Sequence, residues 1–400
     1  KLLIVAAVLV SIIAIVCCCC AGGMFVLSNT GDFPSLPEIE LTIPSLEIET
    51  ATPAPTPDVN RDPAGDLGEE TEALLEDMVV PERDLHELAI RLQGLPADTP
   101  RTAAVSEVPI YEVGDRRLFH ASNVDTEEQF DLYATLRYKT DHVYMWVEEG
   151  EPINESNLKA AADLFEEQTY STNRAFFGAE WTPRVDNDPH LSILHATNLG
   201  NSVAGYYSSA DQFVSEVRED SNEMEMFYIN IDNVSVNSAF YNGVLAHEFQ
   251  HMIHWYNDRN EETWLNEGFS ELATYLNGFD VGGSDYLFAD APDTQLNSWP
   301  SGPGAAGANY GGSYLFTSYF LDRFGSEATR ALVAHEENSF ASVDAVLREQ
   351  GSELTYEDLF GDWVVANLLD DPGILDGRHG YDDLDPPAVE PQRSMLRAPE

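Results

Sequence analysis

The segment Val244-Leu-Ala-His-Glu-Phe-Gln-His-Met-Ile-His-Trp255 carries the pattern with the most chemical content in this chain. His247 and His251 are four residues apart, and on a helix this spacing places both side chains on one face, with Cβ atoms about 5–6 Å apart. Two imidazole nitrogens can then bind one ion at about 2.0–2.1 Å, the normal Zn–N distance. Glu248 can reach a water molecule at an open coordination position, where it would act as a general base. Two ordinary packing histidines would give the same pattern, so the pair alone does not distinguish a metal site from a packing role.

A second segment, Trp264-Leu-Asn-Glu-Gly-Phe-Ser-Glu-Leu-Ala273, supplies carboxylates at helical spacing. Glu267 and Glu271 are four residues apart, on one face of a second predicted helix, and fifteen residues separate His251 from Glu267. If the polar loop 257–262 joins two antiparallel helices, Glu267 lies opposite both histidines. Three protein ligands with a fourth position left for water form the arrangement of a catalytic zinc site.

Together, these two segments resemble the gluzincin zinc metallopeptidases, in which the third ligand is the glutamate of an Asn-Glu-Gly element. They are most similar to the hyicolysin-like group and to the bacterial surface peptidases called immune inhibitor A-like. The matching motifs span residues 238–278. The metzincin pattern is absent, because His254 and Asn257 stand where that pattern has Gly and His.

The resemblance implies a role for each matching residue. His247, His251 and Glu267 would hold one Zn²⁺ per chain, and Glu248 would be the catalytic base. Glu271 would orient the first histidine, in agreement with the rule that a metal-bound imidazole donates its other N–H to a carboxylate or carbonyl. The alternative for Glu271 is a solvated helix face. We expect His254 to be a packing or supporting histidine, because the ligand count is complete without it.

Gluzincins also use a Tyr or His from their helical half to stabilise the oxyanion that forms during hydrolysis. Here the run Asn309-Tyr-Gly-Gly-Ser-Tyr314 opens a helix that we expect to end at Gly325. Tyr314 is the first candidate because we place it in the first turn of that helix, and Tyr310 is the second. Ordinary aromatic packing is the alternative for both. The glycine-rich loop 302–312 could shape or cover a cleft.

The order of the elements predicts an α+β protein, with strands first and helices afterwards. We expect a zincin-like body made of a small mixed sheet, an active-site helix that begins after Ser238, and a helical C-terminal subdomain that extends to about residue 370. The run 191–200, followed by 204–211, could be the edge strand that receives an extended peptide, or an internal strand and loop. Helices are expected at 84–93 and 157–177, and strands at 108–113, 130–138, 142–147, 191–195 and 226–231.

Changes in composition divide the chain into five expected segments. These are a transmembrane anchor or uncleaved signal at 1–28, an acidic Pro-rich stalk at 29–82, a small β-rich unit at 83–150, a catalytic subdomain at 151–290 and a helical subdomain at 291–400. The β-rich unit could be an accessory domain or a pro-segment.

The apolar run at 2–27 exceeds the roughly 7–15 residues of a signal-peptide core and matches the roughly 20 that cross a bilayer. We therefore expect a single-pass cell-membrane anchor with an extracytoplasmic body, and secretion is the alternative. All four cysteines lie in this run, at Cys17–Cys20, where they are either lipidated or simply fill the helix. Any metal in the body must then be bound by His, Asp or Glu.

Charge and composition restrict the partners. The chain has 400 residues with 70 acidic and 20 basic side chains, a net charge of −50, which excludes nucleic acid as an expected partner. The acidic turn from Asp186 to Asp188 lacks a complete calcium loop, so calcium is not supported.

We expect a peptide or protein substrate. Two alternatives stay open: a zinc hydrolase that acts on another substrate, and a non-catalytic acidic surface-binding protein with a structural zinc site.

Overall fold

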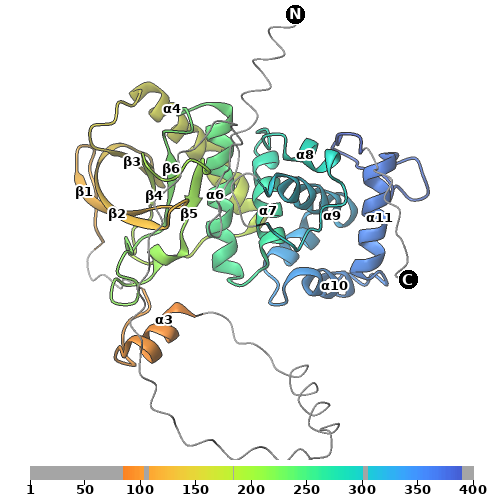
Figure 1. Ribbon diagram of the computed structural model, residues 1–400, viewed down its shortest axis with the longest axis horizontal. Helices are drawn as coiled ribbons and strands as arrows, with labels where there is room; N and C mark the ends of the chain where they lie inside the picture. Colours follow the sequence, from red (N-terminus) through yellow and green to blue (C-terminus); the bar gives the residue numbers. More distant parts are fainter. Residues whose placement is uncertain (1–83, 103–107, 183, 301–304, 390–400) are drawn as a thin grey trace, which may run out of the picture. The chain divides into compact units, whose positions relative to one another are not determined.

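Figure 1 shows the computed structural model of the chain, which describes residues 84–102, 108–182, 184–300 and 305–389. The predicted anchor at 1–28 and the predicted stalk at 29–82 lie outside these residues. Within the described ranges, no helix combines the length and the apolar character needed to cross a bilayer.

A six-stranded mixed sheet forms the N-terminal half of the described chain, with strand order β1-β2-β3-β4-β6-β5. The pairs β1–β2, β2–β3 and β5–β6 are antiparallel, whereas β3–β4 and β4–β6 are parallel. Every residue of β4 and β6 is buried, as expected for parallel strands covered on both faces. The strands are β1 (Arg116–Asn123), β2 (Glu128–Lys139), β3 (Val143–Glu148), β4 (Leu191–Ala196), β5 (Gly205–Tyr207) and β6 (Met226–Asn230).

The first three strands belong to this same sheet, which differs from the expected separate β-rich unit at 83–150. The reason is that β3 pairs along its length with β4, from Val143 opposite Leu191 to Val147 opposite His195. The expected strand at 108–113 is not formed, and its described residues are irregular. The edge strand β1 begins a few residues later and was not expected.

Helices pack on the sheet through a continuous apolar core. The expected helix at 157–177 is a helical run made of α4 (Glu155–Leu164), the π-helical turn η2 (Phe165–Thr169) and α5 (Tyr170–Phe177). Asn154 caps its start by accepting hydrogen bonds from two backbone N–H groups. Phe165 and Tyr170 contact the ring of Phe249 in the long helix α6 (Ala239–Asn257), which therefore packs against this layer.

The second half of the described chain is helical, and Figure 1 places α6 between the sheet and α7. Ser238 caps α6 through a hydrogen bond from Tyr241 N, as its sequence position predicts. The described chain thus combines a mixed sheet with a helical C-terminal region, in agreement with the expected α+β class. The remaining helices are the short α3 (Leu85–Leu88) with the π-helical turn η1 (Ala89–Gln93), the 3₁₀ turn η3 (Ser209–Gln212), α7 (Thr263–Leu276), α8 (Ser284–Asp290), α9 (Gly307–Val333), α10 (Ser339–Glu349) and α11 (Tyr356–Leu369).

Candidate metal centre

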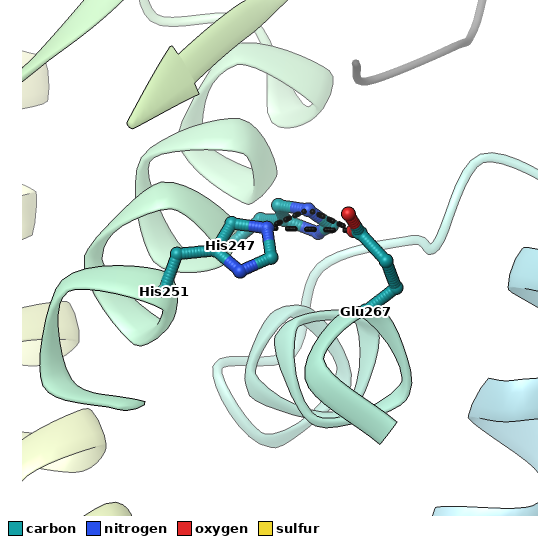
Figure 2. A group of neighbouring side chains, drawn as sticks. All are labelled: His247, His251 and Glu267. Atoms are coloured by element: carbon teal, nitrogen blue, oxygen red, sulfur yellow. Dashed lines mark hydrogen bonds and ion pairs between the residues drawn. The ribbon is translucent and has the colours of Figure 1, made fainter. Parts of the chain in front are cut away.

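Two neighbouring helices bring the expected ligands together. His247 and His251 lie one turn apart on α6, and Glu267 lies on α7, which follows after the short loop 258–262. Figure 2 shows the two imidazole rings and the carboxylate pointing toward one another. All three side chains are buried, with Glu267 only 1% exposed.

The three facing atoms form a small triangle. His247 Nε2 lies 3.0 Å from His251 Nε2, and Glu267 Oε2 lies 3.2 Å from the former and 3.4 Å from the latter. Ligands of a tetrahedral ion at 2.0–2.1 Å are separated by about 3.3 Å, so these atoms are spaced as zinc ligands would be. The group could therefore hold a divalent metal, and its two nitrogens and one carboxylate oxygen suit zinc.

His251 is held by a network that the sequence patterns did not reveal. Its Nδ1 lies 2.5 Å from Asn266 Oδ1 and 3.0 Å from Ser270 Oγ, which in turn donates to Gln250 Oε1. An acceptor at Nδ1 keeps the proton on that nitrogen and leaves the Nε2 lone pair for a metal. Asn266 stands directly before Glu267, and Ser270 follows one turn later, so helical spacing was the available signal.

Glu271 lies behind His247. Its Oε1 is 3.7 Å from His247 Nδ1, on the ring nitrogen that does not face Glu267. Burial, followed by the charges of nearby carboxylates with Glu267 foremost, raises the pKa of Glu271 well above its usual range. This position fits the supporting role that the resemblance implies.

The electrostatics of the group favour a bound cation. Burial alone would lower the pKa of His251, but the negative charges of Glu267 and Glu248 outweigh it and raise that pKa to about 9. Burial alone would raise the pKa of Glu267, yet the two histidines hold it at about 2. In the metal-free chain a proton on His251 therefore compensates the charge of buried Glu267, and a bound cation would take the place of that proton.

An open cleft of about 680 Å³, including solvent space, lies beside the group, and its lining includes His247, Glu248, Glu271 and Tyr310. Glu248 is buried within this lining, next to the first histidine. The rest of the wall is mixed. Its apolar part consists of Ala204, Phe240, Val244, Val281 and Leu287, and its polar side chains are Thr274, Asp280 and Ser284.

The positions of the two tyrosines are the reverse of those expected, because Tyr310 and not Tyr314 lines the cleft. Tyr310 lines the cleft, with its ring centroid 6.4 Å from that of His247. Tyr314 does not belong to the cleft lining and instead packs against Tyr275 at 6.0 Å. The reason is that α9 begins at Gly307, earlier than expected, so Tyr310 occupies its first turn and Tyr314 lies a turn deeper.

Of the two runs expected at a peptide-binding edge, the first forms β4, which is internal because it lies between β3 and β6, and the second contains β5, which is at the edge of the sheet. The edge on that side is β5, which directly follows the cleft residue Ala204. In the acidic turn, Asp188 accepts hydrogen bonds from the Tyr144 hydroxyl and from His190 N.

Comparisons with known proteins add little to this geometry. No family model matches the chain, and no curated protein matches it. Among solved structures it is similar to an M1 zinc metallopeptidase from Deinococcus radiodurans, at 16% identity and a TM-score of 0.32, over 69% of this chain and 54% of that chain. The chain thus spans about half the length of that structure. The class defined by the contacts above is a mixed α+β protein with a buried His-His-Glu group that could bind a metal.

Proposed function

We propose that this chain is a zinc-dependent peptidase of the gluzincin type. The observation that carries the proposal is the convergence of His247 Nε2, His251 Nε2 and Glu267 Oε2 to within 3.0–3.4 Å of one another beside an open cleft. A glutamate adjacent to the first histidine lines the same cleft, so a base and a candidate metal group share one space.

Zinc, when bound by these three residues, would supply a Lewis acid that polarises the substrate carbonyl and acidifies water. Glu248 takes a proton from the attacking water and delivers it to the nitrogen of the departing amine. The Tyr310 hydroxyl donates a hydrogen bond to the carbonyl oxygen as negative charge develops there. Asn266 orients His251 by accepting a hydrogen bond from its Nδ1, and the Glu271 carboxylate, 3.7 Å from His247 Nδ1, attracts that side of the His247 ring.

A peptide is the favoured substrate because the cleft has an apolar wall for a side chain and lies next to an edge strand. Ala204 lines the cleft and leads directly into β5, which pairs only with β6 among the described strands. An extended peptide that adds to such an edge gains main-chain hydrogen bonds, and the neighbouring pocket selects its side chains.

The decisive variant is Glu248→Gln, assayed on casein. We expect it to keep its zinc, because the three ligands remain, and to lose nearly all turnover, because the amide cannot accept the proton. Chelation should abolish the activity of the unmodified protein, and added zinc should restore it. Cleavage by Glu248→Gln at the unmodified rate would refute the assignment.

The same assay separates the alternative functions. Hydrolysis of small esters or amides without cleavage of casein would indicate a zinc hydrolase with another substrate. Zinc binding without any hydrolysis would indicate a structural site in a binding protein.

We also propose that residues 2–27 anchor the chain in the cell membrane and that the body is extracytoplasmic. This part of the proposal is based on the apolar run alone. The test is cell fractionation with and without residues 1–28. The full chain should sediment with membranes and be accessible to protease from outside, and the shortened chain should leave the membrane fraction. Recovery of both chains in the same soluble fraction would refute the anchor.

A further inference from the structure

A second group of metal-ligating side chains lies where α6 ends and the loop to α7 begins. It consists of His254, Asp258 and Glu261, and each offers one ligand atom such that the three atoms lie within 4.8 Å of one another. None of the three belongs to the His247, His251 and Glu267 group, and the proposed peptidase function does not use them.

His254 is the first observation that points to a ligand here. Its side chain is fully buried, and neither ring nitrogen has a hydrogen-bond partner among the described residues. The ring packs edge-on against Phe269, with centroids 5.7 Å apart. A buried polar group without a partner destabilises the folded protein, so a protein that keeps one usually gives it something to bind. Burial, together with the nearby His251, lowers the pKa of His254 to about 3, and a neutral imidazole is the form that binds metals.

Glu261 is the second, independent observation. Its Oε1 accepts hydrogen bonds from Ser339 N at 2.8 Å and from Glu262 N at 2.6 Å. These bonds fix the carboxylate, whereas Oε2 is buried and has no hydrogen-bond partner in the part of the chain that the structure describes. A carboxylate held through one oxygen presents the other as a ready ligand.

We propose that His254, Asp258 and Glu261 form a second binding site for a divalent cation of the zinc class. One imidazole nitrogen and two carboxylate oxygens suit zinc better than calcium or magnesium, which prefer oxygen ligands alone. The two carboxylates balance the two positive charges of the ion, so the buried site becomes neutral. The ion would also supply a partner for one His254 nitrogen and for Glu261 Oε2, which have none in the described part of the chain.

The position of the group indicates a structural role. His254 belongs to the last turn of α6, Asp258 follows as its C-cap, and Glu261 lies in the loop that leads into α7. Glu261 also contacts Ser339, the first residue of α10. A cation here joins the end of α6 to the loop before Glu267 and to the C-terminal helices. Binding to the folded chain alone stabilises it by mass action.

The experiment counts zinc in the full-length protein. The protein is stripped with a chelator, reloaded with excess Zn²⁺, desalted and measured by elemental analysis. We expect two equivalents for the unmodified chain. The double variant His247→Ala with His251→Ala should retain one equivalent, because it leaves only the second group intact. This result distinguishes the new site from the proposed peptidase centre.

His254→Phe should also retain one equivalent and should lose the part of the zinc-induced rise in melting temperature that belongs to this site. Phenylalanine fills the space beside Phe269, and Glu261→Gln keeps an oxygen for Ser339 N, so at least one of these variants is expected to fold. Glu262→Gln is the matched control, because Glu262 accepts from Ser339 Oγ and is not a member of the group. It should keep both equivalents.

One equivalent in the unmodified chain, with no change in His254→Phe, would overturn the proposal. A zinc-induced rise in melting temperature that is as large in His254→Phe as in the unmodified chain would do so as well. That result would identify His254 as an uncompensated buried histidine.

Discussion

Glu271 Oε1 lies 3.7 Å from His247 Nδ1, while the opposite ring nitrogen, Nε2, lies 3.2 Å from Glu267. The imidazole is therefore held between a carboxylate in the ligand triangle and a carboxylate outside it. Burial and neighbouring carboxylates raise the pKa of Glu271. A positive charge on the His247 ring or at the metal position would lower the pKa of Glu271 again. The ionised form of Glu271 and a bound cation therefore favour each other.

Glu271→Gln should therefore weaken zinc binding by about 10–100-fold, the usual cost of losing such a partner. The variant keeps the three proposed ligands and the shape of the side chain. The measurement is competition with a chelator of known affinity, and the exposed Glu353→Gln serves as control. Equal zinc affinity in both variants would show that Glu271 does not support the site.

Tyr310→Phe should lower kcat on casein by about 10²–10³-fold and leave zinc content unchanged, because it removes one hydrogen bond to the developing oxyanion. Tyr314→Phe is the matched comparison on the same helix. Its ring packs against Tyr275 away from the cleft, so we expect kcat to change little. A large fall in kcat for Tyr314→Phe, with Tyr310→Phe near the unmodified value, would reverse the assignment made from the cleft.

The helical spacing of the candidate ligands could be predicted because it depends on local geometry alone. A spacing of four positions, from His247 to His251 and from Glu267 to Glu271, places both side chains of a pair on one face of any helix. The approach of Glu267 to the histidines required one further assumption, an antiparallel helix pair, which the short loop 258–262 favours. Helical spacing places Asn266 and Ser270 one turn apart beside Glu267, but their contacts with His251 also depend on how α7 is rotated about its axis, which the spacing alone does not give.

The sheet shows the opposite case, in which pairing over a long sequence distance was missed. From β3 through α4 and α5 to β4, the chain forms a strand, a helical segment and a second strand. This is the pattern of parallel strands joined by a helical crossover. A domain boundary at residue 150 divides that unit. The misplacement of Tyr310 and Tyr314 has a smaller cause, since a helix start that is wrong by a few residues moves side chains by most of a turn.

Gly268→Ala should destabilise the protein by about 1–3 kcal/mol through overpacking. Gly268 directly follows Glu267, and a Cβ there would lie 2.8 Å from Ser313 O and 2.9 Å from Thr317 Cγ2 of α9. The glycine of the Asn-Glu-Gly element is thus needed for the close packing of α7 on α9. The control is Gly361→Ala in α11, where a Cβ meets nothing within 4 Å. Helix propensity predicts a gain of up to about 1 kcal/mol for this control. Urea unfolding of both variants measures the difference, and equal stability would contradict the packing argument.

Glu225→Gln should remove part of the pH dependence of stability. Both carboxylate oxygens of Glu225 lie near Val185 N, at 3.0 and 3.1 Å, and the side chain is buried. Burial raises the pKa of Glu225 from 4.5 to about 8; Arg184 and the Val185 N–H oppose this rise, and the charge of Asp186 adds to it. Between these two pH values the folded chain holds a proton that the unfolded chain has lost. Stability therefore falls as pH rises through this window, by at most about 1.4 kcal/mol per pH unit.

In the glutamine variant this contribution is absent, so its unfolding free energy should change less between pH 5 and pH 8 than that of the unmodified chain. Urea unfolding in the presence of a chelator is the appropriate measurement, because zinc binding depends on pH as well. The exposed Glu219→Gln, in the loop before β6, should retain the unmodified slope. Parallel pH profiles for Glu225→Gln and the unmodified chain would show that Glu225 is already ionised in the folded protein at pH 5.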